Sequence, residues 1–244
     1  MTIVVCIKCV DGIAIASDSM LTIGEAQQSG QKIHIIEQQQ LFAFAGDLSL
    51  AERFRVFATT HYPLLAQAGH KFDYATTIAA SLANNLRLTG IEPQAANLMT
   101  ILIHEFKGDV EACLFTAGVN PRYLDSDHFS CAMGSGASAA LPFLNFLLET
   151  FTSNGQPELV DGKLFATWAV KYAIDRLAGG VGGDIDLAIA ERNETGQWIF
   201  RELPMAEVHE SIGAIESAAD ALRDWKRSFS DSSNTEPVPK PPRQ

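Results

Sequence analysis

The spacing of apolar residues changes several times along this chain, and each change marks a predicted element. Short runs of β-branched and apolar residues predict strands, which pair as hairpins across turns such as Asp11-Gly12. Apolar residues that recur at three- or four-residue intervals predict helices instead. The predicted strands are 2–10, 13–18, 32–37, 41–45, 98–106, 110–116, 129–133, 185–192 and 198–203. The predicted helices are 48–68, 73–88, 137–152, 162–178 and 206–227.

Three local features refine this pattern. Pro63 lies inside the first helical stretch and should kink or interrupt it, because proline has no N–H group to donate. Asp73 is of a residue type that caps helices, so we expect it to begin the second helix. Residues 19–31 are polar and contain glycine, which predicts a loop.

The order of the predicted elements is strands, two helices, strands, two helices, strands and one helix. Hairpins with helices in pairs predict two packed antiparallel sheets that helices cover on both outer faces, an α+β fold. We therefore expect one domain over residues 1–227. Residues 228–244 are polar and rich in proline and serine, and should form a disordered tail because they have too little apolar surface to bury.

Composition narrows the class of protein. The chain has 244 residues, 47% of them hydrophobic, which suits a soluble protein of one domain, or two small ones, with a sizeable core. A net charge of −11 argues against a nucleic-acid partner, since phosphates are bound by basic patches. No apolar run approaches the roughly 18 residues that span a membrane, and the start lacks the features of a secretory signal. A cytoplasmic protein is the expectation.

The four cysteines lie in apolar, strand-like surroundings, which favours buried free thiols. Cys6 and Cys9 have the C-x-x-C spacing, but on a strand they would point to opposite faces. No second pair of ligands follows at the spacing of a zinc site. The sequence therefore predicts no metal.

Thr2 carries the first candidate chemistry. Removal of Met1 would leave a threonine with a hydroxyl and a free α-amine, and an adjacent base activates a hydroxyl as a nucleophile. An α-amine has an ordinary pKa of about 7.7–8.0, which suits a proton acceptor near neutral pH. The alternative is an ordinary protein start, because many chains begin with Met-Thr.

Two charged residues could assist such a nucleophile. Asp18 ends the second predicted strand, and the hairpin would place it beside Thr2. Lys32 opens the third strand among apolar residues, so it should face inward with a partner, and Asp18 could be that partner. The alternatives are a solvated turn aspartate and an exposed lysine at a strand end.

Two glycine-containing turns could supply backbone N–H donors. Gly46 lies between the fourth strand and the first helix, where a glycine lets the backbone approach a ligand closely. Gly134-Ser135-Gly136 follows a short strand and allows the same interpretation. The alternative at Gly46 is an ordinary strand-to-helix turn with Asp47 as the cap.

The order of these motifs resembles that of the proteasome-type N-terminal nucleophile (Ntn) hydrolases, a group that includes bacterial proteasome-like peptidases. The resemblance covers residues 2–205 and is carried by six segments. They are 2–4, 15–24, 32–33, 42–46, 131–136 and 183–189.

The resemblance implies a four-layer αββα sandwich and assigns a role to each candidate residue. Thr2 would be the nucleophile, with Asp18 and Lys32 as its acidic and basic partners. Thr22 would bind the substrate backbone, Gly46 would supply an oxyanion donor, and Ser135 would support the threonine amine. The family usually has an aspartate and a serine where this chain reads Ala178-Gly179-Gly180-Val181; Asp175 or Asp184 would have to substitute.

The sequence thus predicts a threonine-type peptidase whose nucleophile is exposed by removal of Met1. The resemblance also implies a self-compartmentalised homo-oligomeric ring, a possible ATP-dependent unfoldase as partner, and no cofactor. Two alternatives remain open: an Ntn hydrolase that cleaves small amides, and a catalytically silent subunit of a ring. The altered 178–181 segment motivates the second.

Overall fold

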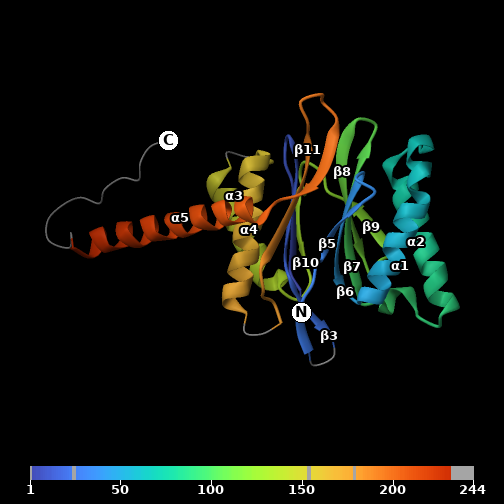
Figure 1. Cartoon of the computed structure of the whole chain (residues 1–244), viewed down its shortest axis with the longest axis horizontal. Helices are drawn as coiled ribbons and strands as arrows, with labels where there is room; N and C mark the ends of the chain where they lie inside the picture. The colour runs from blue at the N-terminus through green and yellow to red at the C-terminus, as the bar shows by residue number, and fades with distance from the viewer. Residues whose placement is uncertain (1, 24–25, 153–154, 178–179, 232–244) are drawn as a thin grey trace.

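Two five-stranded antiparallel sheets packed face to face form the centre of the molecule (Figure 1). The computed structural model describes residues 2–23, 26–152, 155–177 and 180–231. The first sheet has the strand order β10 (Ser130–Met133), β1 (Val4–Lys8), β2 (Gly12–Asp18), β11 (Ile185–Arg192) and β12 (Trp198–Glu202). The second has the order β5 (Ile33–Ile36), β6 (Gln40–Gly46), β7 (Leu98–Phe106), β8 (Asp109–Thr116) and β9 (Asn120–Tyr123).

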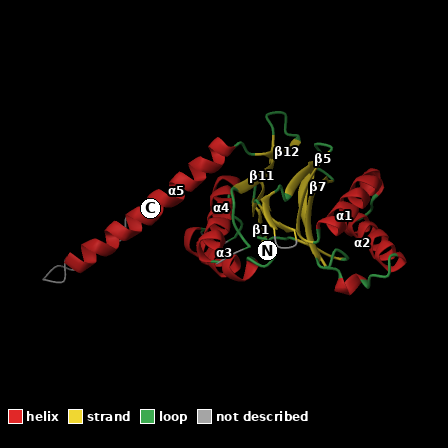
Figure 2. Ribbon diagram, turned by 60° about the horizontal axis from the view of Figure 1, so that its bottom comes forward, coloured by secondary structure: helices red, strands yellow, loops and turns green. Residues whose placement is uncertain are grey.

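Helices cover both outer faces of this sandwich (Figures 1 and 2). The first sheet is covered by α3 (Ala137–Phe151) and α4 (Leu159–Arg176). The second is covered by α1 (Leu48–His61) and α2 (Lys71–Leu88), with short 3-10 turns at Tyr62–Gln67 and Pro93–Ala95. The predicted αββα sandwich is confirmed.

The alternation of side chains along β1 shows how the layers are built. Val4 and Cys6 pack between the two sheets, whereas Ile3, Val5 and Ile7 pack under α3 and α4. Successive residues of a strand point to opposite faces, and here both faces are buried, so the strand is apolar throughout. Burial on both sides explains why this segment could be recognised as a strand from its composition.

The cysteines follow the same geometry. Cys6 packs between the sheets and Cys9 lies on the helix-covered side, as their spacing predicts. All four cysteines are buried and free, which confirms the expectation of buried thiols.

Three strands escaped prediction. The expected loop over residues 19–31 contains a two-stranded ribbon of β3 (Met20–Ile23) and β4 (Ala26–Ser29). The edge strand β9 contains Pro121, a residue that sheets tolerate at their edges. None of the three shows the alternation of apolar and polar residues that predicts a half-buried strand.

The first two helices differ from the prediction at their boundaries. The first helix ends at His61 and a 3-10 turn containing Pro63 follows, so the predicted interruption is confirmed. The cap of α2 is His70, whose Nδ1 accepts a hydrogen bond from the Phe72 N–H at 3.2 Å. Asp73 is instead the third residue of the helix, where its carboxylate accepts a hydrogen bond from the His70 N–H at 2.7 Å. The two residues form a reciprocal capping box.

The last helix, α5 (Met205–Asp231), begins against α4 and extends away from the body (Figures 1 and 2). Val208 and Ile215 are buried on its body side, whereas residues 220–228 are all exposed. The helix continues past 227, so residues 228–231 are helical where we expected the tail to begin. The rest of the predicted tail, 232–244, lies outside the described residues. Among the described helices, none is long and apolar enough to cross a membrane.

Candidate active site

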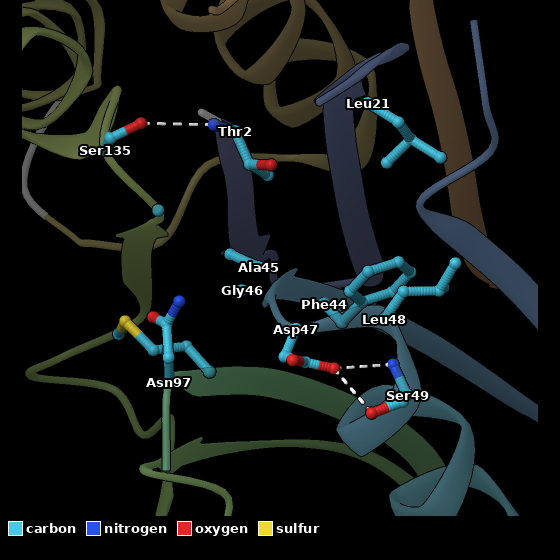
Figure 3. A pocket seen from close by; sticks show the side chains of 12 residues that line it. Thr2, Leu21, Phe44, Ala45, Gly46, Asp47, Leu48, Ser49, Asn97 and Ser135 are labelled. Atoms are coloured by element: carbon cyan, nitrogen blue, oxygen red, sulfur yellow. Dashed lines mark hydrogen bonds between the residues drawn. The ribbon is translucent and has the colours of Figure 1, made fainter. Parts of the chain in front are cut away.

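A cleft of about 910 Å³ opens at one end of the sandwich (Figure 3). β1 and β7 begin at this end and β6 and β10 finish there, so residues distant in sequence converge. The first sheet contributes Thr2, Gly134 and Ser135 to the wall of the cleft. The second sheet, its neighbouring helix and β3 contribute the rest, which are Leu21, Phe44, Ala45, Gly46, Asp47, Leu48, Ser49, Asn97 and Met99.

Thr2 is held by the turn that follows β10. Its backbone nitrogen donates to the Ser135 hydroxyl oxygen at 3.1 Å, and its carbonyl accepts from the Gly136 N–H at 3.0 Å. With Met1 attached this nitrogen is an amide. Once freed it would be an amine, and the Ser135 hydroxyl could then donate to it, since a hydroxyl both donates and accepts.

Glycine is required at position 134 for two reasons. Its φ of +89° lies in the left-handed region, which side chains other than glycine rarely adopt. A Cβ atom there would also lie 2.3 Å from the Thr2 carbonyl oxygen. The turn can therefore close around Thr2 only without a side chain.

Asp18 is fully buried directly behind Thr2. Its Oδ1 accepts from the Lys32 ammonium at 2.6 Å and from the Ile3 N–H at 2.9 Å. Its Oδ2 accepts from the Gly182 N–H at 3.1 Å. These bonds connect the start of β1, the start of β5 and the loop before β11. The alternative of a solvated turn aspartate is therefore wrong.

Lys32 is fully buried as well, so the alternative of an exposed strand-end lysine is wrong. Burial lowers the pKa of its ammonium below the ordinary value, while the hydrogen bond and charge of Asp18 oppose that change. Lys32 is not among the residues that line the cleft. Its link to Thr2 runs through Asp18 and the N–H of the neighbouring residue, Ile3.

Gly46 ends β6 with a φ of +114°, and a Cβ atom there would lie 2.1 Å from the Asn97 carbonyl oxygen. The next residue, Asp47, donates its N–H to that same carbonyl at 2.8 Å. Its side chain caps α1 by accepting from the Ser49 and Leu50 N–H groups. The capped turn that we held as an alternative is therefore present, and it also forms part of the cleft wall.

Thr22 lies in β3, opposite Gln27 of β4, but its side chain is outside the described part of the chain. The neighbouring Leu21 lines the cleft, which places this ribbon beside the other candidates. A role for Thr22 stays a prediction.

The loop before β11 is described from Gly180 onward; residues 178–179 lie outside the described residues. Gly182 uses its backbone to contact Asp18 and Met20, and Val181 is buried in the core. Asp175 forms an exposed ion pair with Lys171 at 3.2 Å, and neither it nor Asp184 lines the cleft. Substitution of either carboxylate for the family's usual loop residues stays a prediction.

Asp186 of β11 is a half-buried charged residue outside the cleft wall that we did not predict from the sequence, and the charge of Lys32 acts on it. Burial and the negative charge of Glu202 raise the pKa of its carboxyl to about 6, with Lys32 acting in the opposite direction. Its Oδ2 atom is buried and has no hydrogen-bond partner among the described residues. The signal was present in Ile185-Asp186-Leu187, a charged residue inside an apolar strand.

Comparison with known proteins agrees with this geometry. The family model described as Proteasome subunit matches residues 2–189, and the chain therefore belongs to the proteasome subunit family. No curated protein sequence matches it.

Two solved structures are similar in fold. One is an Anbu (Gly-1) mutant from Hyphomicrobium sp. strain MC1, with a TM-score of 0.73 and 17% identity over 97% of this chain and 100% of that one. The other is Anbu from the same strain, with a TM-score of 0.70 and 15% identity over 96% and 98% of the two chains. At such identities the likeness shows the fold alone.

Proposed function

We propose that this member of the proteasome subunit family is a threonine-type peptidase, with Thr2 as the nucleophile once Met1 is removed. The observation that carries the proposal is the position of Thr2. Its nitrogen contacts Ser135 at the wall of a cleft, and the residue that follows it is bonded to the buried Asp18–Lys32 pair.

The reaction would begin at the Thr2 hydroxyl. Its oxygen attacks the carbonyl carbon of a peptide bond while its proton passes to the α-amine of the same residue, directly or through water. The resulting oxyanion collapses, the C–N bond breaks, and the proton moves from the amine to the leaving nitrogen. An acyl ester remains on Thr2, and a water molecule activated by the same amine hydrolyses it.

The surrounding groups would make this chemistry possible at neutral pH. Lys32 supplies a positive charge behind the nucleophile, and Asp18 holds that charge in place. Ser135 orients the α-amine, and the backbone N–H of Gly46 would donate to the oxyanion. Thr22 would align the substrate backbone. None of these steps needs a metal or an organic cofactor.

Replacement of Thr2 with alanine tests the proposal. We expect Thr2→Ala to abolish peptide hydrolysis, because the nucleophile is lost, and to leave the melting temperature close to that of the unaltered protein. Ser126→Ala, an exposed serine outside the cleft, is the control and should retain activity. Hydrolysis of peptides by Thr2→Ala at the original rate would refute the role of Thr2.

The same assay separates the two alternatives. An Ntn hydrolase specific for small amides would cleave those but no peptides, in a Thr2-dependent manner. A silent subunit would cleave neither, even with Met1 removed and the threonine amine free.

Self-association into a ring that encloses these clefts is also part of the proposal. Three apolar side chains of α3 support it, because Leu141, Phe146 and Phe151 are 37%, 55% and 50% exposed. Large apolar side chains left exposed are available for contacts between subunits. An ATP-dependent unfoldase as partner and a cytoplasmic location remain proposals. A monomeric mass by light scattering would contradict the ring.

A further inference from the structure

Among the described residues that form the wall of the cleft, Asp47 has the one charged side chain. The polar remainder, Thr2, Ser49, Asn97 and Ser135, is neutral, and the other side chains are apolar or absent. A peptide that enters the cleft therefore meets one charged side chain, which is negative, in addition to the α-amine that Thr2 gains once Met1 is removed.

The charge of Asp47 is held in position by the start of α1. Its Oδ1 accepts from the Ser49 N–H at 2.7 Å, the Ser49 hydroxyl at 2.7 Å and the Leu50 N–H at 3.2 Å (Figure 3). The bond from the Ser49 hydroxyl is the largest cause of a lowered pKa at this carboxyl, which is therefore ionised at neutral pH. Its Oδ2 makes no hydrogen bond to the described residues and stays available to a ligand.

The nearby cations are directed elsewhere. Arg53, in the second turn of α1, donates to the side chains of Asn85 and Thr89 at the end of α2, and its charge contributes only the smallest part of the lowered pKa of Asp47. Lys32 is buried and bonded to Asp18. Within the described residues, the wall of the cleft thus contains no basic side chain that would neutralise Asp47.

We propose that Asp47 makes this cleft selective for peptides that carry lysine or arginine beside the bond to be cleaved. This inference rests on the proposed peptidase function and names its substrate class. The ammonium or guanidinium group would donate to Oδ2 of Asp47, a charge-assisted hydrogen bond. The aliphatic stem would lie against apolar wall residues such as Phe44 and Leu48, as long basic side chains commonly do.

The expected size of the preference for a basic side chain follows from the exposure of Asp47 to water. Asp47 is exposed, so water weakens its attraction, and an exposed ion pair corresponds to a preference of about 1.5- to fivefold. Salt screens such pairs, and the preference should shrink at about 1 M ionic strength, where the screening length falls to about 3 Å.

Asp47→Asn is the decisive variant. Asparagine caps helices as well as aspartate does, so the start of α1 is retained while the charge is removed. Three peptides that differ at one position, with lysine, norleucine or glutamate beside the cleaved bond, should be compared by kcat/KM. We expect the unaltered protein to prefer lysine over glutamate by about 1.5- to fivefold, and Asp47→Asn to lose that preference. Glu52→Gln removes the same charge one turn along α1, outside the cleft wall, and should keep it.

A binding measurement keeps the test independent of turnover. Fluorescence anisotropy with the Thr2→Ala variant would report the affinity of the same three peptides without hydrolysis. An Asp47-dependent affinity for the lysine peptide without hydrolysis by the unaltered protein would refute the peptidase and keep the selectivity. Equal affinities for the three peptides, or a lysine preference that survives in Asp47→Asn or at high salt, would overturn the inference.

Discussion

The two walls of the cleft are built in different ways. On the side of the first sheet, Thr2 is tied through Ile3 to Asp18 and Lys32, and the two charged residues are fully buried. On the side of the second sheet, Asp47, Ser49 and Asn97 are exposed, and their bonds serve the turn and the start of α1. The first wall is a bonded polar network in the core, and the second is a solvated surface.

This difference separates the two tasks of the proposed enzyme. A buried network holds its groups in one geometry because any displacement leaves a charge without its partner. Side chains on a solvated wall can be substituted with little loss of stability, so the substrate preference of this wall can change without loss of the fold. Substitutions in the first wall should therefore affect folding and catalysis together, whereas those in the second should affect selectivity.

The largest effect on stability should come from Lys32→Ala. Removal of the ammonium leaves Asp18 buried and unpaired, which costs about 3–5 kcal/mol for buried ion pairs in general. Lys171→Ala is the matched control, because it breaks an exposed ion pair to Asp175 at 3.2 Å and should cost less than about 1 kcal/mol. Urea unfolding measures both. A loss for Lys32→Ala no larger than that of the control would contradict the account of a tightly bonded first wall.

An intermediate effect is expected for Gly134→Ala. The new Cβ would overlap the Thr2 carbonyl, and the alanine would have to adopt the positive φ of Gly134. Together these two effects should cost about 2–3 kcal/mol. Gly108→Ala separates the two causes, since it has a φ of +86° but nothing within 4 Å of the added atom. Its loss should be about 1 kcal/mol. Peptide hydrolysis should fall with Gly134→Ala only; equal losses in both variants would show that contact with Thr2 is unimportant.

The smallest effect, and one of opposite sign, is expected for Asp186→Asn. The folded carboxyl has a pKa of about 6 against an ordinary value of 3.8, so the folded state binds its proton more tightly than the unfolded state. Stability is therefore lost as the pH rises from about 4 through 6, and asparagine removes that loss. Because Asp186 is half-buried and water screens it, the variant should gain only about 1 kcal/mol at pH 8 and nothing at pH 4.

Urea unfolding at the two pH values checks this prediction. A variant less stable at pH 8 would mean that Lys32 depends on the negative charge of Asp186. The buried network of the first wall would then include a third charged residue beyond Asp18 and Lys32.

The sequence predicted the buried wall better than the solvated one. Thr2, Asp18 and Lys32 lie at the ends of apolar strands, where a charged or hydroxyl residue stands out against its neighbours. Asn97 carries no such contrast, because its place in the cleft depends on where β7 meets β6. The β3–β4 ribbon was missed because backbone pairing defines it more than a buried face does. Asp186 stands out as a charged residue within an apolar strand. The sequence alone does not show that Asp186 is half-buried and that Asp184, two residues earlier, is exposed.

The role of Thr2 as the nucleophile is tested most sharply by mass spectrometry of the protein after reaction with a peptide vinyl sulfone. We expect an N-terminal peptide that begins at Thr2 and carries one added inhibitor, with no such adduct in Thr2→Ala. Mature protein that begins at Thr2 and stays unmodified, while still hydrolysing peptides, would contradict the assignment of Thr2 as the nucleophile.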